Sequence, residues 1–427
     1  MKRYEQSESH LARAQTTIPI GSQTFSKSRT QYPVGISPLY IDKAKGCHVW
    51  DLDGNKYIDL VSALASITLG YADKGVNRAV SRQLKRGVSF SLPGKLEAEV
   101  AEMLCEIIPS AEMVRFGKNG SDATSAAVRL ARAFTGRDHI LVCGYHGWQD
   151  WYIGSTSRNK GIPEQVSSLT HQVEYNNILA LSRLIDTYPD QIACLVMEPM
   201  NSSFPDSGYL QAVQNLTEKN GIVLVFDETI TGFRFARGGA QELFGVTPDL
   251  STFGKGIANG FPLSAVVGKR EIMMEMEEIF FSGTFGGELL SLAAAREVLK
   301  RHQTNDVCGQ LNQLGERLNN SINSMFENYK LSEVLRLSGH PTWQFLGWTK
   351  TAEHEVDELK TYFMQEAFSS GLLVLGTLNI TLSHLKQEKH ILDKFDSVLS
   401  KLSATLQSGQ LRDLLQVEPL RPLFKVR

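Results

Sequence analysis

Two ionisable residues follow short apolar runs that are typical of buried strands. The run 222–226 ends at Asp227, which places a carboxylate at the end of a strand. An unpaired buried carboxylate costs several kcal/mol, so Asp227 needs a partner. A helix N-cap or a metal ligand would be ordinary roles, and binding a protonated ring nitrogen would be a catalytic one.

Lys255 stands between Gly254 and Gly256 after a second short apolar run. Glycines allow close approach of a ligand and positive φ angles. A desolvated lysine has a lowered pKa and is a nucleophile towards aldehydes. A single lysine is ordinarily a surface charge, but the flanking glycines favour a covalent site here.

Two further segments carry residues suited to a phosphate and to a flat ring. Gly120 and Ser121 precede a helical pattern, whose free N–H groups form an anion site. The Walker ending and the GxGxxG pattern are absent, which argues against an NTPase and a dinucleotide fold. Tyr145 and His146 follow the apolar run 139–143 and are placed to stack on a flat cofactor. Taken alone, a helix cap and a packed aromatic loop explain these segments equally well.

The elements that must position these residues alternate between helices and apolar strands from about residue 73. This pattern predicts an α/β fold with a mainly parallel sheet covered on both faces, whose ligands bind at the carboxyl ends of the strands. Asp53-Gly54 between alternating apolar positions predicts a hairpin. The expected helices are 4–15, 95–108, 122–135, 211–220 and 307–329, and the expected strands are 113–116, 139–143, 192–197 and 222–226.

Three segments are expected along the chain. Residues 1–60 form an N-terminal arm and hairpin of a small domain, residues 61–300 the large cofactor domain, and residues 301–427 the rest of the small α/β domain with a tail. The last stretch, 407–427, is rich in Leu and Arg and has no assigned structure.

Composition excludes several classes of partner. The 427 residues carry a formal net charge of −2, and no basic tail or stripe stands out, so nucleic acid and membrane are poor partners. The N-terminus has no apolar signal core, and the apolar stretches are too short to span a bilayer. The five cysteines form no CxxC pair, so no metal site is indicated. We expect a cytoplasmic protein without a metal.

Taken together, these motifs resemble those of fold-type I, class III pyridoxal-5′-phosphate (PLP) aminotransferases, in the glutamate-1-semialdehyde aminomutase-like branch. The resemblance covers residues from about 12 to 400. It rests on VRFGKNGSDATSAAVRLARAFTGR, YHGW, MEP, FDETITGFR, PDLSTFGKGIANGFP and SGTFGGELLS in this order.

The resemblance implies a role for each residue of the cofactor site. Lys255 would hold PLP as a Schiff base and move a proton, and Asp227 would pair with the pyridinium nitrogen. The remaining cofactor-binding residues would be Gly120 and Ser121 at the phosphate, Tyr145 and Thr229 on the two ring faces, His146 beside the ring, and Glu198 near the ring hydroxyl. Thr284 would reach the phosphate of a neighbouring subunit, which implies an obligate homodimer.

Departures from the branch concern the substrate. Lys27 stands where aminomutases carry a carboxylate-binding arginine, Trp148 replaces a smaller polar residue, and Thr229 replaces an aliphatic one. Lysine lacks the bidentate fork of arginine, and the loop around Lys27 is rich in hydroxyls. A solvated arm with Lys27 as a surface charge would explain this loop as well.

With Lys27 and Trp148 as substrate-binding residues, we expect transfer of an amino group from an amino acid to a carbonyl acceptor. The acceptor would be a keto- or aldehydo-sugar of bacterial surface polysaccharide biosynthesis, and glutamate-1-semialdehyde would be a poor substrate. Open alternatives are an aminomutase, an amino-acid racemase or epimerase, and a cofactor-binding protein without catalysis.

Overall fold

The computed structural model describes residues 3–421. Two compact units share this range, and each is built from separate stretches of the chain. Within residues 3–421, the terminal unit contains the residues up to Ala65, Leu69–Asp73, and those from Gln310 onwards. The central unit contains Ser66–Thr68 and Lys74–Gly309.

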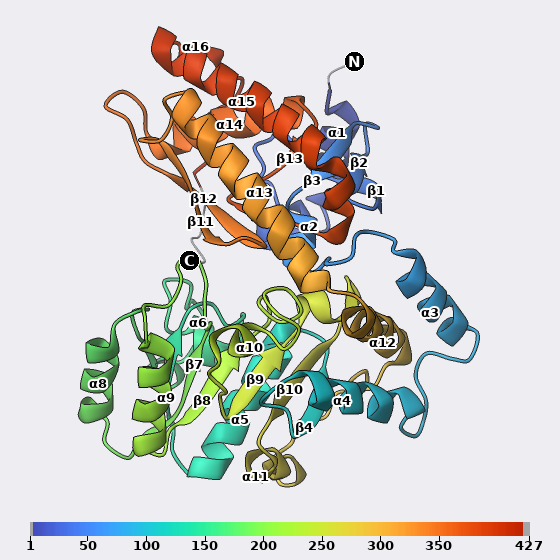
Figure 1. The fold of residues 1–427 in the computed structure, drawn as a ribbon, viewed down its shortest axis with the longest axis vertical. Coiled ribbons are helices and arrows are strands. Elements are labelled where there is room, and N and C mark those ends of the chain that lie inside the picture. Colours follow the sequence, from blue (N-terminus) through green and yellow to red (C-terminus); the bar gives the residue numbers. More distant parts are fainter. Residues whose placement is uncertain (1–2, 422–427) are drawn as a thin grey trace. The chain divides into compact units, whose positions relative to one another are not determined.

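A seven-stranded sheet forms the middle of the central unit (Figure 1). Strand β10 is antiparallel to both of its neighbours, β4 and β9, and the other neighbouring pairs are parallel. The mainly parallel α/β sheet expected from the sequence is thus confirmed. The strands in spatial order are β4 (Met113–Gly117), β10 (Ser264–Gly268), β9 (Leu250–Phe253), β8 (Val223–Asp227), β7 (Ile192–Met197), β5 (His139–Cys143) and β6 (Thr170–Gln172).

Both faces of this sheet are covered, and the central strands β7, β8 and β9 are buried at every position. Val196 and Val225 pack into one core with residues of α5 (Gly120–Thr135). Leu195 and Leu224 point to the other face, where α8 (Ile178–Thr187) and α9 (Tyr209–Lys219) contribute apolar residues. Each fully buried aliphatic side chain contributes about 1.5–3 kcal/mol. The remaining longer helices of this unit are α3 (Lys74–Leu84), α4 (Lys95–Ile107) and α12 (Leu289–Thr304).

Helix α5 begins at Gly120, two residues before the start expected from the sequence. Asn119 is the N-cap residue, and its backbone N–H donates to the carboxylate of Asp122 at 2.8 Å. Gly136 ends the helix in the left-handed conformation at φ 68°. This early start brings Gly120 and Ser121 into the first turn, where backbone N–H groups have no acceptor within the helix.

The terminal unit holds two small sheets and the helices of both chain ends. The hairpin around Asp53-Gly54 is confirmed, with β2 and β3 antiparallel and Gly54 at φ 84°. One sheet has the order β1 (Ile41–Lys45), β2 (His48–Asp51), β3 (Lys56–Asp59) and β13 (Leu372–Leu373), and the other β11 (Leu335–His340), β12 (Trp343–Trp348) and β14 (Thr377–Asn379). The helices are α1 (Glu5–Ala14), α14 (Val356–Ser369), α15 (Glu388–Ser408) and α16 (Leu411–Leu414), and α13 (Val307–Asn328) leads into this unit.

The unassigned stretch 407–427 contains the end of α15 and all of α16, and residues 422–427 lie outside the described range. Among residues 3–421, no helix combines the length and apolar character that crossing a membrane requires. The same range contains no group of three or more His, Cys, Asp or Glu side chains arranged to hold a metal ion.

Candidate active site

Asp227 is the last residue of β8 and is 5% exposed. Its Oδ2 lies 2.9 Å from Nδ1 of His146. Its Oδ1 accepts hydrogen bonds from the backbone N–H of Thr229 at 3.1 Å and from the hydroxyl of Thr252 at 3.2 Å. The end of β8 therefore carries a buried carboxylate, and hydrogen bonds hold both of its oxygens in place.

This environment keeps Asp227 ionised. Burial alone would raise the pKa of Asp227, but the hydrogen bond and charge of His146, together with hydrogen bonding from Thr229, outweigh it and lower the pKa below its ordinary value. Because an ionised carboxylate only accepts, Nδ1 of His146 must carry the proton and donate. The site thus presents a buried negative charge to whatever enters beside it.

Lys255 begins a short 3₁₀ helix, η3 (Lys255–Ala258), directly after β9. Its own φ is 43°, in the left-handed region, whereas Gly254 is extended at φ −167°. The glycines were expected to take the positive φ angle, and the lysine takes it instead. For a non-glycine residue this left-handed conformation is unfavourable by about 1–2 kcal/mol. A strained backbone conformation of this kind persists only where the surrounding structure enforces it, and residues in such conformations are often found at functional sites.

The flanking glycines serve close packing. A Cβ at Gly254 would lie 3.2 Å from Cγ2 of Thr229, and a Cβ at Gly256 would lie 2.8 Å from Oγ1 of Thr68. The two glycines therefore let the lysine segment pack closely against its neighbours on both sides, whereas the sequence led us to expect close approach of a ligand.

The first turn of α5 provides an anion-binding end. The backbone N–H groups of Gly120 and Ser121 make no hydrogen bond within the described part of the chain. A Cβ at Gly120 would lie 3.1 Å from Cγ2 of Thr229, so a larger residue here would require Thr229 to shift by a few tenths of an ångström. Two free N–H groups at a helix N-terminus are suited to a phosphate.

Aromatic and acidic residues from β5 and β7 complete the walls. Tyr145 follows β5 and meets Tyr152 edge-on, with ring centroids 5.7 Å apart. Its backbone N–H donates to Glu198, which follows β7 and is 4% exposed, at 3.3 Å. His146 is also buried and meets Tyr152 edge-on at 5.3 Å. These side chains stand at the carboxyl ends of parallel strands, where such folds bind ligands.

One cavity of about 290 Å³ brings the predicted cofactor residues together. Its walls include Gly120, Ser121, Tyr145, His146, Glu198, Asp227, Thr229 and Lys255. The wall also contains residues to which the sequence assigned no role, Ser66, Lys118, Ile230 and Phe261 among them. Lys118, Ile230 and Phe261 lie within the quoted motifs, which imply no separate role for them, and Ser66 lies in a segment without a recognisable pattern.

Three predicted residues do not line this cavity. Trp148 is 65% exposed, although its backbone N–H lies 3.4 Å from the hydroxyl of Ser121. Thr284 is exposed in the loop before α12. Lys27 belongs to the terminal unit, where it lines a separate cavity of about 480 Å³. Their proposed roles with substrate and with a second subunit stay predictions.

Thr252 and Glu228 are missed residues next to the site. Thr252 holds Asp227 from β9, and only the strand pairing shows this contact. Glu228 is fully buried and accepts hydrogen bonds from the hydroxyl of Thr231 and from the backbone N–H groups of Ala240 at 2.7 Å and Gln241 at 2.8 Å. Burial raises the pKa of Glu228 to about 7, against these hydrogen bonds.

The residues of the cavity fit PLP. Nε2 of His146 and Oγ1 of Thr229 are buried in the cavity wall and have no hydrogen-bond partner among residues 3–421, as expected where a polar ligand completes the site. Asp227 would hold the ring nitrogen, and the N–H groups of Gly120 and Ser121 would hold the phosphate. Lys255 would supply the amine that reacts with the aldehyde.

A mainly parallel sheet with a lysine and an ionised aspartate at its carboxyl edge defines a fold-type I PLP enzyme. The chain belongs to the class-III aminotransferase family, whose profile, described as "Aminotransferase class-III", matches residues 31–402. Its cofactor is pyridoxal 5′-phosphate, and its chemistry is that of PLP-dependent aminotransferase-type enzymes.

Relatives and solved structures agree on this family. The chain is 40% identical over 337 residues to the glutamate-1-semialdehyde 2,1-aminomutase of Methanobrevibacter smithii, covering 73% of this chain and 79% of the relative. It is 34% identical over 393 residues to glutamate-1-semialdehyde 2,1-aminomutase 2 of Brevibacillus brevis, covering 88% and 91%.

Among solved structures, the FumI protein of Sphingopyxis sp. MTA144, in its PLP internal aldimine form, has a TM-score of 0.88 at 25% identity, covering 97% of this chain and 99% of that one. An omega-transaminase from Sphaerobacter thermophilus has a TM-score of 0.85 at 26% identity, covering 94% and 100%.

Proposed function

We propose that this enzyme moves an amino group within a small amino-carbonyl compound, in a reaction of the glutamate-1-semialdehyde 2,1-aminomutase type. The support is the identity of 34–40% to relatives of that name over most of the chain. The sequence alone favoured transfer to a separate acceptor, and these relatives shift the preference to the intramolecular reaction. The cavity at Lys255 is about 290 Å³, at the low end of ligand pockets. A space that must also hold the cofactor favours a compact substrate over a sugar.

The side chains of the site would have separate roles in the reaction. PLP, when bound, supplies a ring that withdraws electrons from the substrate carbon being deprotonated. Asp227 would place a negative charge beside the ring nitrogen, and His146 holds that carboxylate in place through its Nδ1–H. Lys255 would hold the cofactor through Nζ, and its amine, when free, would accept and return a proton at the substrate carbon. The first turn of α5 anchors the phosphate.

A second function, transamination between an amino acid and a separate carbonyl acceptor, is favoured by Lys27. A lysine offers a carboxylate a point charge and no bidentate fork. This weakens the argument for a carboxylated aldehyde as substrate. An omega-transaminase is also among the similar structures.

One experiment separates the two functions and tests the site. Purified enzyme loaded with PLP is incubated with glutamate-1-semialdehyde alone, and 5-aminolevulinate is measured. In parallel, it is incubated with single amino acids while the cofactor absorbance is followed. Formation of 5-aminolevulinate without added amino donor supports the aminomutase. Conversion of the cofactor to its pyridoxamine form by an amino acid, with no 5-aminolevulinate, supports the transaminase. Borohydride reduction and peptide mapping should place the cofactor on Lys255, and a label on another lysine contradicts the site.

We further propose that the enzyme works as a homodimer in which Thr284 completes the site of the partner. The loop that holds Thr284 also exposes two large apolar side chains, Phe280 at 79% and Phe285 at 60%. Apolar side chains exposed to this extent beside one another are typical of surfaces that become buried on association. Together with the resemblance at Thr284, they support a shared active site.

A further inference from the structure

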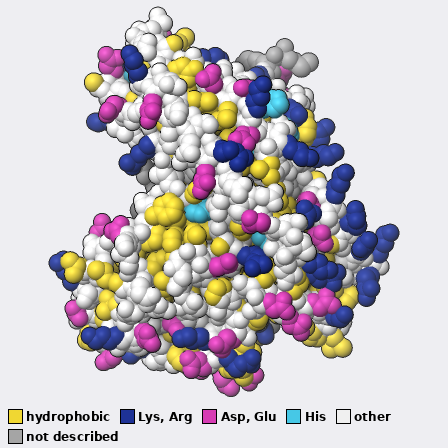
Figure 2. Space-filling view, viewed as in Figure 1, with side chains coloured by type: hydrophobic (Ala, Val, Ile, Leu, Met, Phe, Trp, Pro, Cys, Tyr) yellow, Lys and Arg dark blue, Asp and Glu magenta, His cyan; other side chains and the backbone are white. Residues whose placement is uncertain are grey.

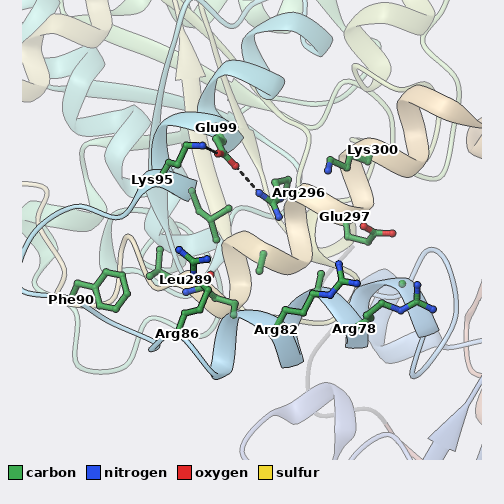
Figure 3. A pocket seen from close by; sticks show the side chains of 15 residues that line it. Arg78, Arg82, Arg86, Phe90, Lys95, Glu99, Leu289, Arg296, Glu297 and Lys300 are labelled. Atoms are coloured by element: carbon green, nitrogen blue, oxygen red, sulfur yellow. Dashed lines mark hydrogen bonds and ion pairs between the residues drawn. The ribbon is translucent and has the colours of Figure 1, made fainter.

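A second concave surface of the central unit carries a concentration of positive charge and lies away from Lys255. We call it the basic groove and define it by Arg78 and Arg82 of α3, Arg86 and Phe90 of the following loop, and Arg296 and Lys300 of α12. Figure 3 shows the three arginines in a row along α3 and its end, with the side chains of α12 on the other side. Its volume is about 550 Å³, and it shares no wall residue with the cavity at Lys255.

Most of this charge is not neutralised. The groove is lined by six cationic side chains and two carboxylates, Glu99 and Glu297. Glu99 is already bound between Lys95 at 2.8 Å and Arg296 at 2.7 Å. The side chains of Arg78, Arg82, Arg86 and Lys300 form no ion pair within residues 3–421. Glu297 is the one remaining carboxylate in the wall to face them.

The arrangement of these arginines has no evident benefit for the fold. Arg78, Arg82 and Arg86 follow one another at intervals of four, so α3 and its end place like charges on one stripe, and residues 74–87 contain no acidic residue. Like charges at this spacing destabilise a helix by about 0.2–0.5 kcal/mol per pair. Figure 2 shows Lys and Arg side chains gathered along this edge. The expectation that the chain carries no basic stripe was therefore wrong for this segment, and α12 adds two further cations from more than 200 residues away.

The shape of the groove indicates what kind of anion it takes. Its floor is apolar, formed by the buried side chains of Leu96, Leu289 and Ala293, and Phe90 stands at one end, 54% exposed. A groove of about 550 Å³ has the size of a small-molecule pocket, which favours a small ligand with a flat apolar part over a membrane surface or a nucleic-acid duplex. Guanidinium groups bind phosphates in a bidentate manner, and an exposed aromatic ring is a stacking surface.

We propose that the basic groove binds a nucleoside diphosphate or triphosphate. The phosphates would lie against Arg78, Arg82 and Lys300, and the base would lie on the apolar floor towards Phe90. Helix α12 forms one wall of the groove and also packs against η3, the segment that begins with Lys255. The same helix therefore touches both sites, although the proposed ligand does not enter the catalytic cavity.

The test is a titration of PLP-loaded enzyme with ADP, followed by isothermal calorimetry at low and at physiological salt. We expect one ADP per chain. Arg78→Gln with Arg82→Gln should weaken binding at least 10-fold. The matched control is Lys74→Gln with Lys85→Gln, which removes two charges from the same segment outside the groove and should change binding less than 2-fold. Pyrophosphate should bind at least 5-fold more weakly than ADP, and adenosine should not bind measurably.

Each contrary outcome overturns the proposal. Equal loss in the two double variants would mean unspecific attraction to a basic surface. Equal affinity for pyrophosphate and ADP would mean that the apolar floor is not used. Absence of ADP binding, with a changed dimer–monomer equilibrium in the Arg78/Arg82 variant, would assign the groove to contact with a second copy. Because the cofactor absorbance and the aminomutase assay are measured separately, failure here leaves the proposed function untouched.

Discussion

Nδ1 of His146 donates a hydrogen bond of 2.9 Å to Oδ2 of Asp227, and both side chains are buried. The two residues come from the ends of different strands, β5 and β8, with β7 between them in the sheet. Their pairing lets a carboxylate remain charged in the interior, where burial alone would favour its protonated form. Under the proposed function, the reactivity of the site would depend on this pair.

Replacing the charge of Asp227 should abolish most turnover. Asp227→Asn keeps the shape of the side chain but removes the anion that would hold the ring nitrogen protonated. Loss of a buried charge-assisted pair costs on the order of 3–5 kcal/mol, so kcat/KM should fall by roughly 10²- to 10⁴-fold. Cofactor absorbance and thermal unfolding are measured alongside, to show that the variant is folded and loaded. Rates close to the wild type would mean that the ring nitrogen has a different partner.

His146 should act as a positioning residue whose loss is visible in the pH profile. His146→Leu removes the donor that lowers the pKa of Asp227, so that pKa should rise and activity at low pH should decline earlier than in the wild type. A loss of about 10- to 100-fold is expected, as for other residues that orient an active-site group. His146→Asn retains an N–H near the position of Nδ1 and should restore part of the activity. An equal loss in both variants with an unchanged profile would indicate packing alone.

The proposed sharing of the active site can be tested by mixing inactive chains. Lys255→Ala and Thr284→Ala subunits are each expected to be impaired as homodimers. After random exchange, half of the dimers are mixed, and each mixed dimer holds one intact site, so activity should recover to about one quarter of the wild type. Subunit exchange is verified by mass spectrometry of tagged chains. Exchange without recovery would show that Thr284 does not serve the partner.

Local sequence patterns were sufficient to predict the strands whose ends carry this site. The runs that became β5 and β7 are buried at nearly every position, and their residues match the expected strands. Strand ends then located Asp227 and Lys255, because parallel strands expose their carboxyl ends on one edge. The local sequence determines which residue stands at the end of a strand. The positions of Asp227 and Lys255 at strand ends could therefore be predicted without a structure.

Contacts between distant segments were not accessible in the same way. The hydrogen bond from His146 to Asp227 spans 81 residues, and nothing in either segment specifies it. Lys255 itself has the positive φ angle that a rule based on residue type assigned to the flanking glycines. The basic groove forms only when α3 and α12 meet. The whole chain has nearly equal numbers of basic and acidic residues, 44 and 46, and this balance conceals the local excess of positive charge in the basic groove.

The departure at Lys27 leads to a prediction about substrate preference. If Lys27 takes the place of the carboxylate-binding arginine, Lys27→Arg should restore a bidentate pair and raise kcat/KM for glutamate-1-semialdehyde. One additional charge-assisted hydrogen bond corresponds to about a 10-fold increase. Arg29→Lys, a change of cation type two residues away, is the control and should have little effect. A Lys27→Arg rate equal to the wild type would show that this side chain does not contact the substrate.

His302 leads to a prediction about stability in acid. Its ring is 3% exposed, packs edge-on against Phe233 with centroids 5.7 Å apart, and lies 3.8 Å from the sulfur of Cys308. Burial, aided by the charge of Arg237, lowers the pKa of His302 to about 4. The folded protein therefore keeps this ring neutral over a range in which the unfolded chain binds a proton.

The sign of the effect follows from this difference. A histidine whose pKa is lowered by folding favours the folded state above its unfolded value near 6.5, and this contribution is lost as the pH falls towards 4. At pH 5 the loss amounts to about 2 kcal/mol. His302→Leu should remove it, so urea unfolding of the variant should change less between pH 7 and pH 5 than that of the wild type. His390→Leu, at an exposed position of α15, is the control and should retain the wild-type difference. The same pH dependence in His302→Leu and in the wild type would show that other groups cause the acid sensitivity.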